Sequence, residues 1–197
     1  YQVAPRALWE LGAEVITIGC SPNGTNINDK CGSTYPKLMA EEVKKNNADI
    51  GIALDGDGDR CIISDEKGNF INGDLLLGII TKRYLDKKLL KNNIIVGTQM
   101  TNKGLENYLN SLDLKLIRTA VGDRYVIKKM KKHNSNLGGE QSGHIILGDY
   151  NSTGDGLVAA LQIIACMKEQ SVPASFLGKK IKLLPQVIES ISYSILK

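Results

Sequence analysis

From Ile50 to Arg60 the chain reads IGIALDGDGDR. The short apolar run from Ile50 to Leu54 is typical of a buried β-strand. A loop follows this run at once, and its carboxylates occupy alternate positions. Open α/β sheets bind their ligands at the carboxyl ends of strands. We therefore predict an α/β protein whose functional site includes residues 55–60.

Strand and helix patterns alternate on both sides of this stretch, as they do in layered α/β proteins. Residues 15–18 predict a second strand, and Asp74 is expected to cap a helix that ends near Lys87. Residues 186–195 predict a last strand. This alternation predicts an α/β fold with two units, over about residues 1–73 and 74–180.

Both ends of the chain look cut. The first unit opens within a helix pattern and has no strand before it. The last stretch has too little chain to bury its own apolar face, because an isolated hairpin or strand is marginal in water. We therefore expect a middle piece of a larger protein.

Composition excludes several classes of protein. Of the 197 residues, 42% are apolar and 23% are charged, which is ordinary for a globular chain. The longest apolar run, 157–167, is too short to span a membrane. The net charge is +4, and the lysines at 128–132 fit a solvated helix face better than a nucleic-acid site. The four cysteines lack CxxC or zinc-ligand spacing, which favours free thiols in the cytoplasm.

The acidic loop has the chemistry of a metal site. Asp55, Asp57 and Asp59 would repel one another unless a cation lay among them, and the glycines between them let the backbone curl. Carboxylate oxygens without soft ligands suit Mg²⁺. Arg60 suits a phosphate that the same metal touches. An EF-hand is the rival reading, but Arg60 stands where its glycine belongs and both flanks read as strands; a solvated polar turn is the other alternative.

These residues resemble a known family. Asp55–Arg60 is similar to the metal-binding loop of the α-D-phosphohexomutases, and the segment GGEQSGH at 138–144 is similar to the sugar-binding loop of that family. Gln141 points to the phosphoglucosamine mutase branch, since the phosphomannomutases and phosphoglucomutases usually have Met there. Segments 10–16, 21–28, 121–126 and 153–156 also resemble this branch.

The resemblance implies a four-domain enzyme, of which this chain would supply two consecutive three-layer α/β/α domains with mixed sheets. Residues 1–73 would be most of the second domain and residues 74–182 all of the third. Residues 183–197 would be a linker and the first strand of the fourth. Such an enzyme interconverts glucosamine 6-phosphate and glucosamine 1-phosphate through a phosphoserine and a bisphosphate intermediate. Domains 1 and 4 would then be partners of this chain, and the full-length enzyme would be a possible homodimer. No nucleic acid or membrane is implied as a partner.

The resemblance also assigns roles. It implies that the three aspartates hold Mg²⁺ against the phosphoserine, that Arg60 acts in catalysis by steadying the phosphate, and that Glu140 and Ser142 bind sugar hydroxyls. His144 is a further candidate, either as a proton shuttle or phosphate ligand or as a structural loop residue. Arg124, at the start of a predicted helix, is a candidate for facing the substrate.

Two departures from the family pattern affect the expected activity. The chain contains neither a serine motif of the Ser-His-Asn-Pro type nor a phosphate loop of the Arg-Ser-Gly-Thr type. We therefore expect this chain on its own to be inactive as a mutase. The alternatives are a phosphomannomutase/phosphoglucomutase of the same family and a non-catalytic module that binds a metal or a sugar phosphate.

Overall fold

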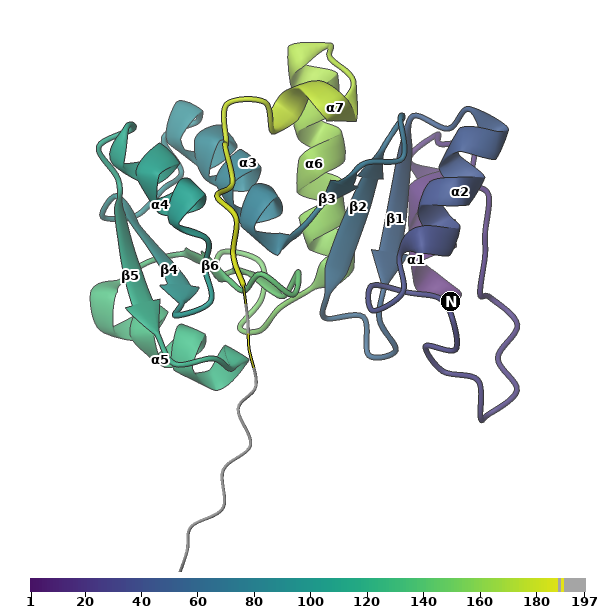
Figure 1. Cartoon of the computed structure of the whole chain (residues 1–197), viewed down its shortest axis with the longest axis horizontal. Coiled ribbons are helices and arrows are strands. Elements are labelled where there is room, and N and C mark those ends of the chain that lie inside the picture. The colour runs from purple at the N-terminus through teal and green to yellow at the C-terminus, as the bar shows by residue number, and fades with distance from the viewer. Residues whose placement is uncertain (188, 190–197) are drawn as a thin grey trace, which may run out of the picture.

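The computed structural model describes residues 1–187 and 189 (Figure 1). The helices are α1 (Val3–Glu10), α2 (Lys37–Asn46), α3 (Gly73–Asp86), α4 (Lys103–Asn110), α5 (Asp123–His133), α6 (Gly156–Gln170) and α7 (Ala174–Leu177). The strands are β1 (Ile50–Leu54), β2 (Cys61–Asp65), β3 (Phe70–Ile71), β4 (Ile94–Thr98), β5 (Lys115–Thr119), β6 (Leu137–Gly139) and β7 (Ile145–Leu147). The predicted α/β class is confirmed.

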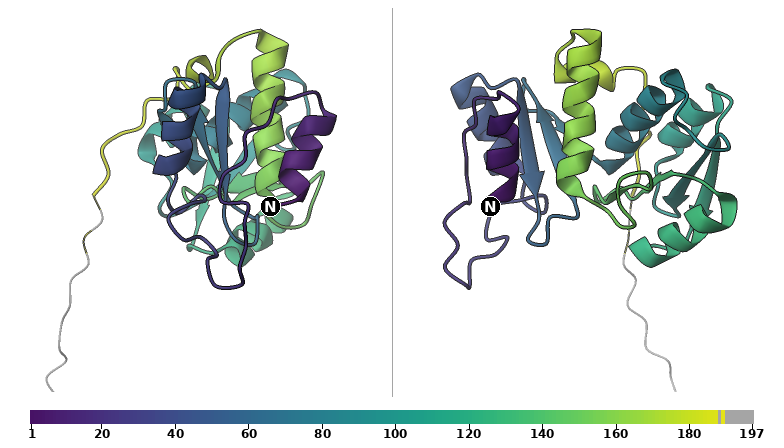
Figure 2. Two further views of the ribbon diagram at one scale, coloured as in Figure 1. Left: turned by 90° about the vertical axis from the view of Figure 1, so that its right-hand side faces the viewer. Right: turned by 180° about the vertical axis from the view of Figure 1, so that it is seen from behind.

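The first sheet has the strand order β1-β2-β3, and its described pairs are all antiparallel. The acidic loop joins β1 to β2, and so short a connection cannot link parallel neighbours, which need a crossover of about a dozen residues or more. Helix α2 covers one face, where Met39 and Val43 pack against Ala53 and Ile62. Helix α6 covers the other face (Figure 2). The expected three layers are therefore present around this sheet.

The second sheet has the order β5-β4-β6-β7 and is mixed, as expected. Strand β4 runs parallel to β5 and β6, whereas β7 runs antiparallel to β6. Helix α5 covers one face, where Val126 and Met130 pack against Val96 and Ile146. Helices α3 and α4 cover the opposite face (Figure 1).

Helices α3 and α6 lie between the two sheets and join them into one core (Figures 1 and 2). Ile63 of β2, Ile80 of α3 and Ile145 of β7 belong to a single cluster of buried apolar side chains. Near the C-terminal ends of these helices, Arg83 Nη2 of α3 lies 2.8 Å from Glu169 Oε1 of α6. The loops at the ends of β1 and β6 are thereby held in a fixed relation.

Three local predictions differ from the structure or lie outside it. Residues 15–18 form no strand, because no described strand lies beside them to pair with their backbone groups, and Ile16 is exposed. Asn72, not Asp74, caps α3: its side chain accepts the Leu75 N–H at 3.1 Å. Most of the strand predicted at 186–195 lies outside the described residues.

Within the part of the chain that the structure describes, every helix falls short of the length and apolar character needed to cross a lipid bilayer.

Candidate functional site

The acidic loop folds so that its three carboxylates converge. One carboxylate oxygen from each of Asp55, Asp57 and Asp59 lies within 4.8 Å of the others. Gly58 has φ +74°, in the left-handed region that glycine adopts without strain, and its N–H donates to the Asp55 carbonyl at 3.2 Å. The Arg60 N–H closes the turn on Asp55 Oδ1 at 3.1 Å. The predicted convergence of the trio is present in the fold.

Asp59 is the carboxylate that most needs a cation. Its Oδ1 atom is buried and has no hydrogen-bond partner among the described residues. Burial raises the pKa of Asp59; contact with His144 opposes the shift, and the charges of Asp55 and Asp57 add to it. A cation among these oxygens would satisfy Oδ1 and remove the repulsion. The donor set consists of carboxylate oxygens, so the residues fit a hard divalent metal ion.

Arg60 stands at the open side of the trio. Its Nε lies 3.7 Å from Asp55 Oδ2 and 3.9 Å from Asp59 Oδ1, which is longer than a hydrogen bond. The side chain is 44% exposed. The guanidinium is therefore kept near the carboxylates by their charge, and its planar fork of donors remains available to an anion.

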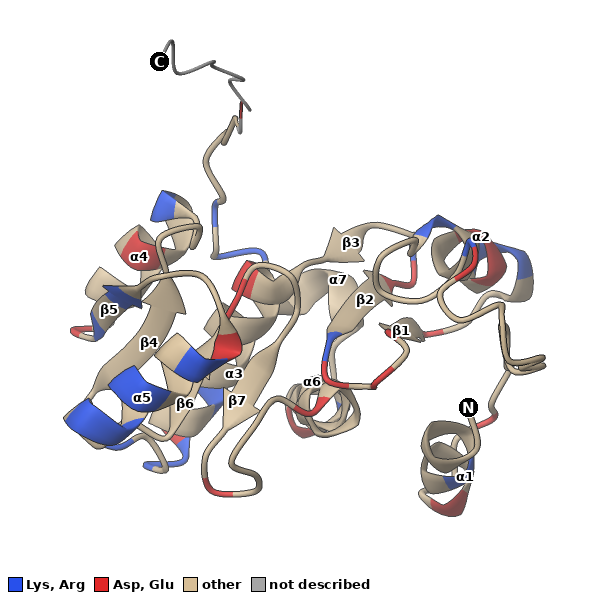
Figure 3. Ribbon diagram, turned by 90° about the horizontal axis from the view of Figure 1, so that it is seen from below, with Lys and Arg blue, Asp and Glu red and all other residues tan. Residues whose placement is uncertain are grey.

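The segment 138–144 meets the acidic loop through backbone contacts. Arg60 and His144 form an antiparallel bridge, and the Cys61 N–H donates to the Gly143 carbonyl at 3.0 Å. A Cβ at Gly143 would overlap the Cys61 carbonyl, so only glycine allows this approach. From the other side, the Gly156 N–H at the start of α6 donates to the Gly58 carbonyl at 2.9 Å. Figure 3 shows the acidic loop, in red between β1 and β2, beside α6.

His144 is buried under the acidic loop, with 2% of its side chain exposed. Its Nε2 accepts the Gly154 N–H at 3.2 Å, and its Nδ1 lies 3.1 Å from Asp59 Oδ2. Because Nε2 is the acceptor, the ring proton is on Nδ1 and is donated to Asp59. In this arrangement the imidazole orients a carboxylate of the trio.

Glu140 and Ser142 lie on the open turn between β6 and β7. The Gly143 N–H donates to the Glu140 carbonyl at 3.0 Å and closes the turn. The half-buried Glu140 carboxylate accepts the Gly122 N–H at 2.8 Å, just before α5, and the Ser142 residue is exposed. A carboxylate beside a hydroxyl offers the acceptors and the donor that a polyhydroxyl ligand requires.

Arg124 lies on the first turn of α5, two residues beyond Gly122. It is exposed, and its Nη2 donates to the Tyr125 hydroxyl at 2.7 Å. Among the described contacts, its side chain is linked to Tyr125 and not to Glu140. The structure therefore brings the trio, Arg60 and His144 together, places Glu140 and Ser142 on the adjoining turn, and leaves Arg124 at the margin.

Sequence reasoning did not predict that the loop containing Ile27 and Ser33 packs against the acidic loop and the end of β1. Ile27 packs so closely on the acidic loop that a Cβ at Gly56 would overlap it. The Ser33 N–H donates to the Leu54 carbonyl at 3.1 Å, and Ser33 Oγ is the other buried side-chain atom without a partner in the described part of the chain. The polar composition of residues 19–36 predicts a loop, but nothing in it indicates which strand end the loop covers.

Two family models match the chain. The model described as phosphoglucomutase/phosphomannomutase, alpha/beta/alpha domain II, matches residues 1–68, and the corresponding model of domain III matches residues 72–182. The phosphoglucosamine mutases of Caulobacter vibrioides (strain NA1000 / CB15N) and Parvibaculum lavamentivorans are 54% and 52% identical to the chain over 193 residues. Each alignment covers 98% of this chain and 43% of the relative, so the chain spans less than half the length of these curated relatives.

Solved structures are similar in fold. A phosphoglucomutase/phosphomannomutase family protein from Burkholderia thailandensis has a TM-score of 0.79 at 22% identity, over 94% of this chain and 40% of its own. The N-acetylphosphoglucosamine mutase of Aspergillus fumigatus, solved with GlcNAc-6P and magnesium, has a TM-score of 0.63 at 19% identity, over 80% and 41% of the two chains. At these identities the likeness concerns the fold alone.

Proposed function

Because the chain belongs to the phosphoglucomutase/phosphomannomutase family, we propose that it supplies the metal-binding and sugar-binding parts of a phosphoglucosamine mutase. The complete enzyme would interconvert glucosamine 6-phosphate and glucosamine 1-phosphate, and this chain would not do so alone. Residues 1–73 and 74–182 would be its second and third domains. The observation that carries the proposal is the backbone bridge between Arg60 and His144, which joins the acidic trio to the turn bearing Glu140 and Ser142.

Phosphoryl transfer requires charge neutralisation and alignment more than covalent chemistry from the protein. Mg²⁺ held by Asp55, Asp57 and Asp59 would supply that neutralisation. The buried, unpartnered Oδ1 of Asp59 supports this assignment. The structure of the Aspergillus enzyme with magnesium agrees with the choice of metal.

The other side chains would position the substrate. Arg60 would bind phosphate oxygens through its guanidinium fork, and Glu140 with Ser142 would bind sugar hydroxyls. The sugar must present first one end and then the other to the same phosphoryl group. Contacts to hydroxyls near the middle of the ring would serve both poses. Arg124, on the margin of the site, would contact the phosphate farther from the metal.

The test is Asp57→Asn in the complete enzyme, with Asp113→Asn as the matched control on an exposed loop. We expect turnover of glucosamine 6-phosphate to fall by about 100-fold or more in the first variant and to stay unchanged in the second. In calorimetric titrations of the 197-residue chain, we expect Mg²⁺ binding to disappear in Asp57→Asn only. Equal Mg²⁺ binding by the two variants would remove the metal assignment.

Substrate class is tested separately, because the family description also names phosphoglucomutase and phosphomannomutase. The complete enzyme should use glucosamine phosphates at a higher kcat/KM than mannose or glucose phosphates. A preference for mannose or glucose phosphates would favour those alternatives. Absence of turnover with all three sugars would favour a binding module.

A further inference from the structure

Residues 181–186, which we call the strap, are packed against the second sheet's helices although they form no regular element. The Ile181 side chain is 6% exposed and lies in the main core, against Gly78 of α3. A Cβ at Gly104 would overlap the Lys182 carbonyl, so the strap backbone runs directly over the first turn of α4. The strap is therefore a fixed part of the structure.

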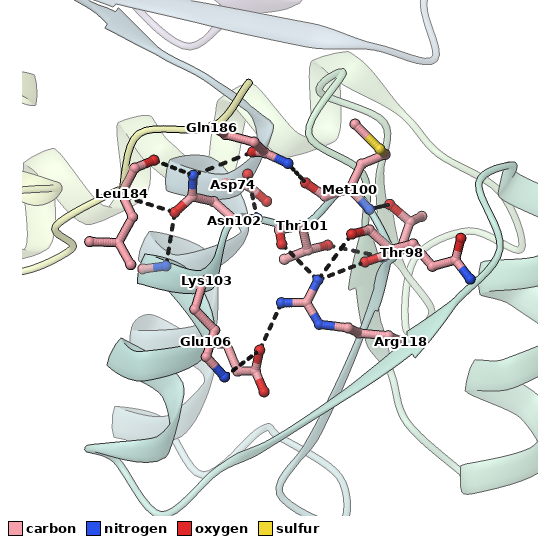
Figure 4. A network of polar contacts seen from close by, with 12 residues as sticks. Asp74, Thr98, Met100, Thr101, Asn102, Lys103, Glu106, Arg118, Leu184 and Gln186 are labelled. Carbon is pink, nitrogen blue, oxygen red and sulfur yellow. Dashed lines mark hydrogen bonds and ion pairs between the residues drawn. The ribbon is translucent and has the colours of Figure 1, made fainter. Parts of the chain in front are cut away.

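Asn102 sets the register of the strap (Figure 4). Its Oδ1 accepts the Leu184 N–H at 2.9 Å, and its Nδ2 donates to the Leu184 carbonyl at 2.8 Å. The same Oδ1 accepts the Gly104 N–H at 2.8 Å and so caps α4. One amide side chain thus pairs with both backbone groups of Leu184, which leaves a single position for the residues that follow.

Gln186 reaches from the strap to the turn between β6 and β7. Its Nε2 donates to the Met100 carbonyl at 3.0 Å (Figure 4), and its Oε1 accepts the Nε2 of Gln141 at 3.1 Å. Gln141 lies between Glu140 and Ser142 in the sequence. Because both ends of the Gln186 amide are hydrogen-bonded, its Oε1 is held in position to accept the Gln141 amide.

The backbone of Gln141 is held as well, by the Gly73 N–H, which donates to its carbonyl at 3.1 Å. Burial raises the pKa of the nearby Asp74 carboxylate, and the Asn102 N–H and the Gln141 side-chain amide oppose that rise. Gln141 is therefore held at two points, by Gln186 at its side-chain amide and by Gly73 at its backbone carbonyl. Its two neighbours in the turn are oriented by the same contacts.

We propose that Gln186 is a positioning residue: through Gln141 it holds Glu140 and Ser142 in the orientation that receives the sugar. This inference rests on the proposed function for its sugar-binding part. It goes beyond that function by making the strap, a segment outside both loops, part of the substrate site. Gln186 itself touches no substrate; its contribution is the orientation of the turn.

The first experiment uses the 197-residue chain and compares Gln186→Leu with Gln99→Leu. Gln99 is exposed on the same edge of the sheet and is the matched control. Hydrogen exchange is measured at the Gly143 amide, which closes the turn on Glu140, and at the Gly73 amide, which bonds Gln141. Loss of a hydrogen bond worth about 1 kcal/mol predicts exchange about 5- to 10-fold faster in Gln186→Leu, and unchanged exchange in Gln99→Leu.

The second experiment uses the complete enzyme and adds Gln141→Leu and the double variant. We expect KM for the sugar phosphate to rise about 5- to 10-fold in Gln186→Leu with kcat within about 2-fold, since only substrate contacts are disturbed. If Gln186 acts through Gln141, the double variant should be no worse than Gln141→Leu alone. A merely structural residue would lower the melting temperature without this non-additivity.

Unchanged exchange in the Gln186→Leu chain, or unchanged KM in an active Gln186→Leu enzyme, overturns the proposal. A parent enzyme without any mutase turnover would contradict the proposed function instead. In that case the exchange comparison would still decide whether Gln186 holds the turn.

Discussion

At the scale of single residues, the contact between His144 and Asp59 links the two loops of the site. The imidazole Nε2 accepts a hydrogen bond from the Gly154 N–H, and its Nδ1–H donates a hydrogen bond to the Asp59 carboxylate. Partners of metal-binding carboxylates commonly tune affinity by orienting the ligand. A small displacement of this ring would therefore be felt by a bound cation.

Gly154→Ala is the sharpest way to displace the ring. A Cβ at Gly154 would overlap the His144 ring, whereas a Cβ at Gly148 meets only ordinary van der Waals neighbours. We expect Gly154→Ala to weaken Mg²⁺ binding by about 10-fold or more and Gly148→Ala to leave it unchanged. Calorimetric titration of both folded variants measures this, and equal affinities would contradict the orienting role.

The ion pair of Glu106 and Arg118 gives a prediction for pH. Arg118 Nη2 donates to Glu106 Oε2 at 2.7 Å, and this bond holds the pKa of Glu106 below its usual value. A lowered pKa in the folded state means that the pair stabilises the fold above the unfolded pKa, about 4.3, and that this contribution is lost as pH falls through the folded pKa.

Glu106→Gln should therefore reduce stability at pH 7 by at most about 1 kcal/mol, since the pair is partly solvated, and by less at pH 3. Urea denaturation at the two pH values measures the difference. Glu41→Gln, on the exposed face of α2, is the control. A loss of stability in Glu106→Gln that was larger at pH 3 than at pH 7 would contradict a stabilising role for the ionised Glu106 carboxylate.

The convergence of the three aspartates could be predicted from the sequence because it is local: alternate carboxylates with glycine between them can converge without help from elsewhere. It could not predict that His144 contacts Asp59, since that contact depends on how β2 and the segment before β7 pair. For Asp74, the prediction from the sequence was wrong. A carboxylate at a helix start predicts a cap, but Asn72 takes that position and Asp74 is buried, where its carboxylate accepts the Asn102 N–H at 3.1 Å.

At the scale of elements, the junction of the two loops depends on one close backbone approach. Gly143 has φ +95°, and its Cα faces the Cys61 carbonyl so closely that no side chain fits. Gly24 has a similar φ of +91°, but open space surrounds it. Alanine substitutions at the two glycines therefore separate the free-energy cost of a positive φ from the free-energy cost of steric overlap.

Gly143→Ala should lower the free energy of unfolding by about 2–4 kcal/mol, and Gly24→Ala by about 1 kcal/mol, because only the first adds a steric overlap to the backbone strain. Urea denaturation of the two variants measures this. Equal losses of unfolding free energy in the two variants would contradict a stabilising role for the close approach of Gly143 to Cys61.

The elements that sequence patterns predicted well are those whose burial is decided locally. Strand β1 has its pattern of small and apolar residues, and α6 has a long apolar run. Residues 15–18 have a comparable apolar pattern but form no strand, because strand formation requires a neighbouring backbone, and none lies beside them in the described structure. A local pattern carries no information about that neighbour.

At the scale of the whole molecule, the main core crosses the boundary between the two units that the sequence predicts. Helix α6 follows the second sheet in the chain, yet it packs on β1 and β2 of the first. Ile63 of the first sheet and Leu109 of α4 are both fully buried in one cluster. The two units should therefore unfold together.

We expect a single calorimetric transition for the 197-residue chain, with equal calorimetric and van't Hoff enthalpies. Ile63→Ala and Leu109→Ala should each shift that whole transition, at a cost of about 2–4 kcal/mol for the cavity they leave. Two separate peaks, of which each variant moved only one, would contradict a shared core.

The bridge between Arg60 and His144 also has a consequence for substrate choice. Backbone hydrogen bonds join the carboxylate trio and the Glu140 turn, so neither can slide relative to the other when a ligand arrives. If the trio holds a cation and the turn holds hydroxyls, as proposed, a ligand would have to contact both loops at the separation that this backbone pairing sets.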